Sequence, residues 1–260
     1  LFNQSPNDRN EDFDVIRNSN VFRIAPSGLL EEVGVNVPCI DYTTGEPLLL
    51  TQPQSTNLLP YSEDFTQWNP VSPGTLISNA TESPTGNLDA TEILSIGTSE
   101  AIYVEDPGLL SEGEYTLSVY VKYKNGDARF SLRVSGILSG SSLFLITEND
   151  VTLQSSQERT SIENVGNGWF RVSAGFISNG IDSTNAQLRG DLDLPYNGFY
   201  IWGAQVEKQP FATSYIPTNG NVATRLGDEI QNAGSTDTIN SEEGVLYFEG
   251  AALTNVEGVD

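Results

Sequence analysis

The 260-residue sequence has no histidine, no methionine and a single cysteine, Cys39. The absence of histidine excludes Ser–His–Asp and Cys–His catalysis, imidazole metal ligands and the usual general base near neutral pH. One cysteine excludes an internal disulfide and a thiolate zinc cluster. Because no apolar run approaches the roughly 18 residues of a membrane-spanning helix, we expect no insertion into a membrane.

Positive charge is also scarce. Lys and Arg number 12 against 35 Asp and Glu, which gives a formal net charge of −23 and a pI near 4.1. A field of this sign repels phosphate backbones, so we expect no nucleic-acid partner.

The chain starts at Leu1 rather than at methionine, and residues 242–249 have the pattern of a first strand. We therefore expect this sequence to be a piece of a longer protein, with residues 242–260 starting a further β domain.

Short alternating runs separated by turn residues dominate the remainder, and helical periodicity is lacking. The clearest run is 115–122, which Asn125-Gly126 separates from a second run at 128–134. Further runs at 169–176 and 199–206 follow, the former after an Asn167-Gly168 turn. This spacing predicts an all-β protein, a jelly-roll β-sandwich preceded by a small β-rich N-terminal arm.

Four regions follow from these patterns. We interpret residues 1–52 as the N-terminal β arm or anchoring region and 53–217 as the sandwich. We interpret the polar, turn-rich residues 218–241 as a linker. We interpret residues 242–260 as the start of a further β domain.

Several motifs occur in a fixed order along the chain. They are GLLEEV at 28–33, NVP at 36–38, IDY at 40–42, QSTNLLPYSEDF at 54–65, WGAQVE at 202–207 and TSYIPT at 213–218. This succession resembles modules of bacteriophage virion fibre and spike proteins, in which a carbohydrate-binding-module-like jelly roll often precedes a laminin-G or concanavalin-like domain.

The resemblance implies a structural protein at the surface of a virion, in a tail or head fibre, with a non-catalytic module for host attachment. It implies other virion proteins as partners, a homo-oligomer that is a trimer by analogy, and a host surface polysaccharide as ligand. Related jelly rolls often hold a structural calcium between an acid near the first strand and an Asp in the last. Glu63 and Asp64 fit the first position, but Trp202 and Gly203 stand at the second. We therefore expect no metal and no cofactor.

Alternation places several basic and aromatic side chains away from the expected core. If the Asn125-Gly126 turn pairs its flanking strands, these side chains share one sheet face. An aromatic ring offers a platform for a sugar, and a guanidinium binds hydroxyls or acid groups. The candidate glycan-binding residues, for an anionic polysaccharide among others, are Tyr120, Lys122, Arg129, Arg133, Trp169 and Arg171.

Two other interpretations of this face stay open. The cations can pair with the abundant carboxylates on a solvated surface, or a neighbouring subunit can cover them. Of the tryptophans, we expect Trp202 in the core and Trp169, beside a turn, at the surface.

Paired carboxylates alone can support glycoside hydrolysis. Asp191 with Asp193, and Glu105 with Asp106, form such pairs, but neither lies among apolar residues that would raise a pKa. Asp182, Asp191 and Asp193 also lack the spacing of a calcium loop of the EF-hand type. We therefore predict no enzymatic activity for this chain.

Two alternative functions use the same fold. The chain can be a carbohydrate-binding module of a secreted bacterial polysaccharide-degrading enzyme, whose catalytic domain lies elsewhere. It can also be a virion-associated depolymerase.

Overall fold

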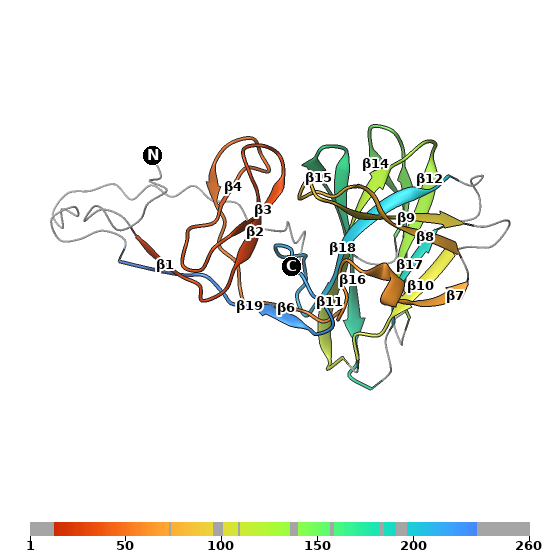
Figure 1. Cartoon of the computed structure of the whole chain (residues 1–260). Coiled ribbons are helices and arrows are strands. Elements are labelled where there is room, and N and C mark those ends of the chain that lie inside the picture. The colour runs from red at the N-terminus through yellow and green to blue at the C-terminus, as the bar shows by residue number, and fades with distance from the viewer. Residues whose placement is uncertain are drawn as a thin grey trace.

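A computed structural model describes residues 13–232, except 73, 96–100, 109, 136–139, 157–158, 182–184 and 191–196. In this part of the chain, the strands form a β-sandwich and an arm that projects from one side of it (Figure 1). The described residues include no α-helix, only the short 3-10 helix η1 (Phe65–Gln67). The predicted all-β sandwich is confirmed.

One antiparallel six-stranded sheet lies next to the arm, and we call it the arm-side sheet (Figure 1). Its strands, in spatial order, are β15 (Thr160–Gly166), β16 (Trp169–Ser178), β11 (Gly113–Tyr123), β18 (Phe199–Glu207), β9 (Leu88–Ser95) and β8 (Gly74–Glu82).

The second antiparallel six-stranded sheet lies on the side of the sandwich away from the arm, and we call it the far sheet (Figure 1). Its strands, in spatial order, are β14 (Val151–Ser155), β13 (Gly140–Ile146), β12 (Ala128–Ser135), β17 (Asn185–Gly190), β10 (Ala101–Glu105) and β7 (Asn69–Ser72).

The core lies between the two sheets and follows from the alternation of each strand. Leu117, Val119 and Val121 of β11 meet Phe130 and Leu132 of β12 there, all at 0% exposure. Burying side chains of this size contributes about 1.5–3 kcal/mol each, so this layer dominates the stability of the sandwich.

The turn between β15 and β16 is a tight hairpin, as its sequence predicts. Asn167 and Gly168 both have positive φ, 52° and 76°, the conformation that a two-residue hairpin loop of type I′ requires. The turn between β11 and β12 differs. Asn125 is not among the residues with positive φ, and Gly126 has φ 143°, so this turn is not of type I′. It carries the chain from β11 in one sheet to β12 in the other.

The arm consists of residues 13–52 and 226–232. Its strands pair two by two, and β6 and β19 pair where the arm joins the sandwich. These pairs are β1 (Asp14–Ile16) with β20 (Glu229–Gln231), β2 (Val21–Ile24) with β3 (Leu30–Val33), β4 (Ile40–Asp41) with β5 (Leu48–Leu49), and β6 (Ser55–Asn57) with β19 (Ala223–Arg225).

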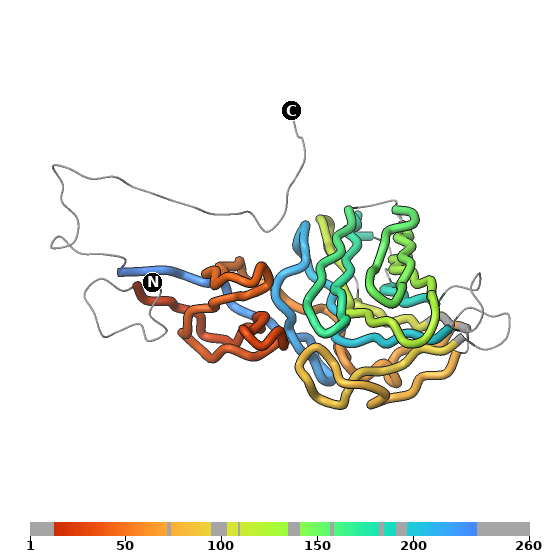
Figure 2. The backbone as a smooth tube through the Cα atoms, turned by 90° about the horizontal axis from the view of Figure 1, so that it is seen from above, coloured from red at the N-terminus to blue at the C-terminus, as the bar shows by residue number. Residues whose placement is uncertain are grey.

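The range that the sequence suggests as a linker is therefore structured in its described part. After the sandwich, the chain returns along the arm through β19 and β20. The start of β1 and the end of β20 lie side by side at the end of the arm furthest from the sandwich (Figure 2).

Candidate functional site

The six residues proposed for glycan binding do not share a face. Tyr120 and Lys122 on β11, and Trp169 and Arg171 on β16, belong to the arm-side sheet, while Arg129 and Arg133 lie on β12 of the far sheet. The condition for a shared face, that β11 and β12 pair, is not met, because their turn crosses the sandwich and each strand has other partners.

The arm-side part of the expected face is buried. Trp169 is 0% exposed, Tyr120 2% and Arg171 7%. These side chains do point away from the sandwich core, but the arm forms a second layer over them. Ile24 and Leu30 of the β2–β3 hairpin pack into one cluster with Tyr120, Trp169, Trp202 and Tyr215. The expected exposure of Trp169 is therefore wrong, and the expected burial of Trp202 is confirmed.

Polar contacts hold this covered face together. Arg171 donates from Nη1 to the carbonyl oxygen of Thr213 at 2.5 Å and from Nη2 to Ser118 Oγ at 3.1 Å. Its guanidinium also lies 5.3 Å from the centre of the Tyr120 ring. Trp169 Nε1 donates to the carbonyl oxygen of Glu82 at 3.1 Å. These polar contacts lie within the sandwich, and the contact between arm and sandwich is the apolar cluster that includes Ile24 and Leu30.

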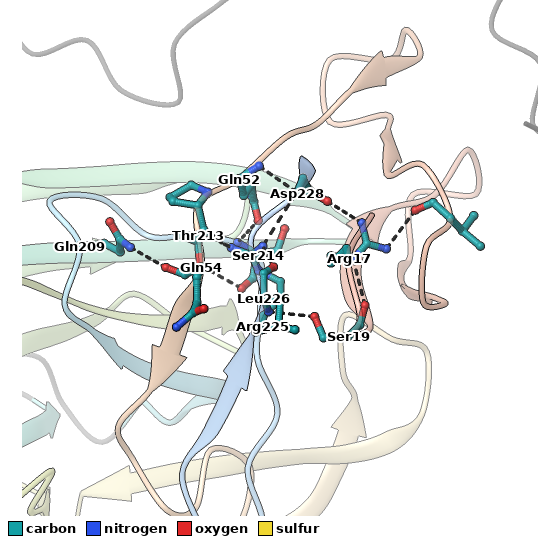
Figure 3. A network of polar contacts seen from close by, with 12 residues as sticks. Arg17, Ser19, Gln52, Gln54, Gln209, Thr213, Ser214, Arg225, Leu226 and Asp228 are labelled. Atoms are coloured by element: carbon teal, nitrogen blue, oxygen red, sulfur yellow. Dashed lines mark hydrogen bonds and ion pairs between the residues drawn. The ribbon is translucent and has the colours of Figure 1, made fainter. Parts of the chain in front are cut away.

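A buried ion pair fastens the arm. Arg17 Nη1 lies 2.7 Å from Asp228 Oδ1, and the two side chains are 0% and 2% exposed. Asp228 Oδ2 also accepts from the backbone N–H of Gln52 at 2.8 Å, and Gln52 Oε1 accepts from the N–H of Ser214 at 3.2 Å (Figure 3). We call Arg17, Gln52, Ser214 and Asp228 the clasp. They join the two chain segments of the arm to each other and to the sandwich.

The outer face of the far sheet has no such cover among the described elements. Ala128, Phe130, Leu132 and Val134 of β12 point into the core, so Arg129, Ser131 and Arg133 alternate outward. On the neighbouring strand β17, Ala186 and Leu188 point inward. Its outward residues are Asn185, Gln187 and Arg189, all half-buried.

The register gathers three guanidinium groups on this face. Arg189 lies opposite Ser131, midway between Arg129 and Arg133, which are four residues and about 13 Å apart along β12. Gln187 lies opposite Arg133. On the other side of β12, Leu145 lies opposite Arg129 and Leu143 opposite Ser131, so aliphatic side chains border the arginines. We call Arg129, Arg133, Gln187 and Arg189 the arginine face.

The charge of this sheet is unlike that of the chain. The six far-sheet strands contain three arginines and one glutamate, a net charge of +2, in a chain of net charge −23. The glutamate, Glu105, is buried and lies opposite Ala186, which points into the core. Among the residues of these strands, the outward charges are therefore all positive, and Arg129 and Arg189 each also have an interaction within the chain.

Sequence reasoning found two of these arginines and missed Arg189 and Gln187. The signal was available, because Asn185, Gln187 and Arg189 alternate with Ala186 and Leu188. The pairing of β12 with β17 joins strands that lie at least 50 residues apart in the sequence. The alternation within each strand does not predict such a pairing.

Two half-buried acids, Glu63 and Asp89, have raised pKa values. Burial raises the pKa of Glu63, the hydrogen bond from Tyr215 opposes this rise, and the charge of Asp89 adds to it. Tyr215 OH donates to Glu63 Oε1 at 2.7 Å. Burial also raises the pKa of Asp89. Sequence reasoning considered Glu63 only as a calcium ligand and did not pair it with Asp89.

The carboxylate pairs considered from sequence have different outcomes. Asp182, Asp191 and Asp193 lie outside the described residues. For Glu105, burial raises the pKa and the charge of Asp106 raises it further, so this acid is more buried than the sequence suggests. Among the residues that the structure describes, no group of three or more His, Cys, Asp or Glu is placed to hold a metal ion. No helix in this part of the chain is long and apolar enough to span a bilayer.

Comparison with known proteins gives only distant likenesses. No protein-family model matches the chain, and no curated protein matches it. Among solved structures, the CBM22-1–GH10 modules of Clostridium thermocellum endo-1,4-β-D-xylanase 10B, complexed with xylohexaose, match 64% of this chain with 15% identity and a TM-score of 0.37.

Two further structures match a smaller part. The enzymatically active domain of tailspike protein 4 from bacteriophage CBA120 matches 55% of the chain with 11% identity and a TM-score of 0.34. A family 16 carbohydrate-binding module matches 52% with 12% identity and a TM-score of 0.32. The chain covers 30% of the xylanase structure, 20% of the tailspike structure and 86% of the family 16 module.

Proposed function

We propose that this chain is a component of a bacteriophage virion fibre or spike, and that its sandwich is a non-catalytic glycan-binding module for host attachment. The ordered motifs from GLLEEV at 28–33 to TSYIPT at 213–218 support the virion role. The observation that carries glycan binding is the arginine face, a sheet surface that no described element covers and that combines guanidinium, amide and aliphatic groups.

The chemistry of this face suits a sugar chain. Gln187 supplies an amide donor and acceptor, Arg133 supplies a fork of N–H donors, and Leu143 and Leu145 supply apolar contact for the C–H faces of sugar rings. Weak binding at each face would gain from several copies on one fibre, because linked sites raise the effective concentration.

A glycan array tests this function. We expect the parent protein to be retained on a subset of surface glycans, and Gln187→Ala to lower that retention without changing the melting temperature. Gln67→Ala, an exposed amide on η1 outside the arginine face, serves as the control. Absence of retention on both the array and host cells would overturn the proposal.

The same proposal includes assembly into a homo-oligomer, a trimer by analogy with fibre proteins, in contact with other virion proteins. Light scattering that gives only the 28.2 kDa mass of one chain would contradict the trimer for this part of the protein.

One observation favours a second candidate function, a virion-associated depolymerase. Glu63 and Asp89 both have raised pKa values, mainly because of burial, a property that general acids share. Incubation with host polysaccharide would show new reducing ends that Glu63→Gln abolishes if this candidate is right. No new ends from the parent protein would dismiss it.

A further inference from the structure

We infer that the ligand of the arginine face is a polysaccharide with repeating carboxylate groups, such as a uronic-acid polymer. This inference rests on the proposed glycan-binding function and adds the chemical class of the glycan.

The first argument is the distribution of charge. The outward strand residues of the far sheet carry three guanidinium groups and no carboxylate. By contrast, the strands of the arm-side sheet together carry two basic and six acidic residues. Because the rest of the molecule repels anions, an acidic polymer approaches most favourably at the arginine face.

The second argument is geometry. A guanidinium group offers five N–H donors in a planar fork that matches a carboxylate, and contact with one partner leaves further donors for another. Arg129, Arg189 and Arg133 follow one another across a distance of about 13 Å on two adjacent strands. A row of this kind suits a linear ligand whose charges recur along its length better than a single small anion.

The third argument concerns the residues that border these arginines. Leu143 and Leu145 are half-buried beside them, so the face also offers apolar contact to sugar rings. Ser131, which lies between Arg129 and Arg133, is 8% exposed. The ligand would therefore contact the arginine side chains rather than Ser131 or the strand backbone.

The test measures binding of the whole chain to polygalacturonate and to its methyl ester, which keeps the sugar backbone and removes the charge. We expect binding to polygalacturonate only, weakening as salt rises from 50 to 200 mM, because screening shortens the range of the attraction. Poly-L-glutamate, a polyanion without sugars, should bind at least about tenfold more weakly, a difference of about 1.4 kcal/mol.

Variants locate the binding on the arginine face. Arg133→Gln and Arg189→Gln should each lower the affinity for polygalacturonate about tenfold or more, since each removes charge-assisted hydrogen bonds. Arg159→Gln removes the same charge from an exposed pair with Glu114 at the edge of the arm-side sheet, and should leave the affinity unchanged. Circular dichroism and thermal unfolding confirm that each variant is folded.

The outcomes separate the inference from the function. Equal binding of the acid and its ester, equal binding of poly-L-glutamate, or equal loss in all three variants would overturn the acidic-glycan inference. Retention of neutral glycans alone, lowered by Gln187→Ala, would leave the proposed function standing and dismiss the inference. No retention of any glycan would dismiss both.

Discussion

At the scale of single residues, the arm turns outward-facing side chains into buried ones. Trp169 alternates away from the sandwich core as its sequence position predicts, yet it is fully covered. Alternation reveals which side of a sheet a residue occupies, but it does not reveal whether a second layer lies on that side. This is why the orientation of Tyr120, Trp169 and Arg171 was predictable and their burial was not.

Truncation of Trp169 tests this second layer. Trp169→Ala should lower the free energy of unfolding by about 3–5 kcal/mol, because removal of a large buried ring leaves a cavity and removes the hydrogen bond to the carbonyl oxygen of Glu82. Urea denaturation measures the change. Ile181→Ala, at a side chain that is 78% exposed, should stay within about 0.5 kcal/mol. A similarly small loss for Trp169→Ala would show that the arm does not seal this face.

The pKa of Glu63 gives a pH dependence of known sign. Burial is the main cause that raises this pKa above the ordinary value of 4.5, so the folded protein retains the proton to higher pH than the unfolded chain. The free energy of unfolding therefore decreases as pH rises through the interval between the two pKa values.

Glu63→Gln removes this contribution. Relative to the parent, the variant should gain stability as pH rises from about 4 to about 7, as followed by urea denaturation at each pH. The control is Ile181→Ala, which removes no titratable group from an exposed position, so its difference from the parent should stay constant. A constant difference for Glu63→Gln as well would contradict the assignment of this carboxyl as buried.

At the scale of strands, local pattern located the elements better than their partners. The runs at 115–122, 128–134, 169–176 and 199–206 coincide with β11, β12, β16 and β18. The pairing of β12 with β17 links distant parts of the chain, and alternation fits either sheet of a sandwich equally well. Asn125-Gly126 has hairpin composition, but Gly126 adopts φ 143° and the strands it joins belong to different sheets.

The clasp makes a prediction for the arm strands. Arg17→Ala alone should lower the free energy of unfolding by about 3–5 kcal/mol, because it leaves the buried charge of Asp228 with only Arg225, 4.0 Å from Oδ2, as a cationic partner. Arg17→Ala with Asp228→Ala should cost less than the sum of the two single changes, as a double-mutant cycle measures.

The exposed pair of Arg159 and Glu114 is the comparison for that cycle, with side chains 49% and 48% exposed. Its coupling should be about 0.2–1 kcal/mol. A coupling of the same size for Arg17 and Asp228 would mean that the clasp does not hold the arm.

At the scale of the whole molecule, arm and sandwich share a buried cluster. The sequence separates residues 1–52 from 53–217, which follows the change in pattern along the chain. Yet Ile24 and Leu30 of the arm share a cluster with Trp169 and Trp202 of the sandwich, and a one-dimensional pattern does not show such a contact.

A chain shortened to begin at residue 53 tests that dependence. Removal of the N-terminal segment of the arm exposes the aromatic side chains that Ile24 and Leu30 cover, so we expect strong binding of the dye ANS and a lower melting temperature than that of the parent. An unchanged melting temperature and no dye binding would show that the sandwich is independent of the arm.

The pairing of β1 with β20 also sets how the molecule carries mechanical load. Asp14 lies opposite Gln231 and Ile16 opposite Glu229, so tension applied on both sides of the described chain separates these pairs one after another, like a zipper. After these pairs, the ion pair between Arg17 and Asp228 is the next contact to break. The two large sheets lie outside the path of the force. Tension along the backbone is thus resisted first at the end of the arm. The arginine face keeps its structure while the strands of the arm separate.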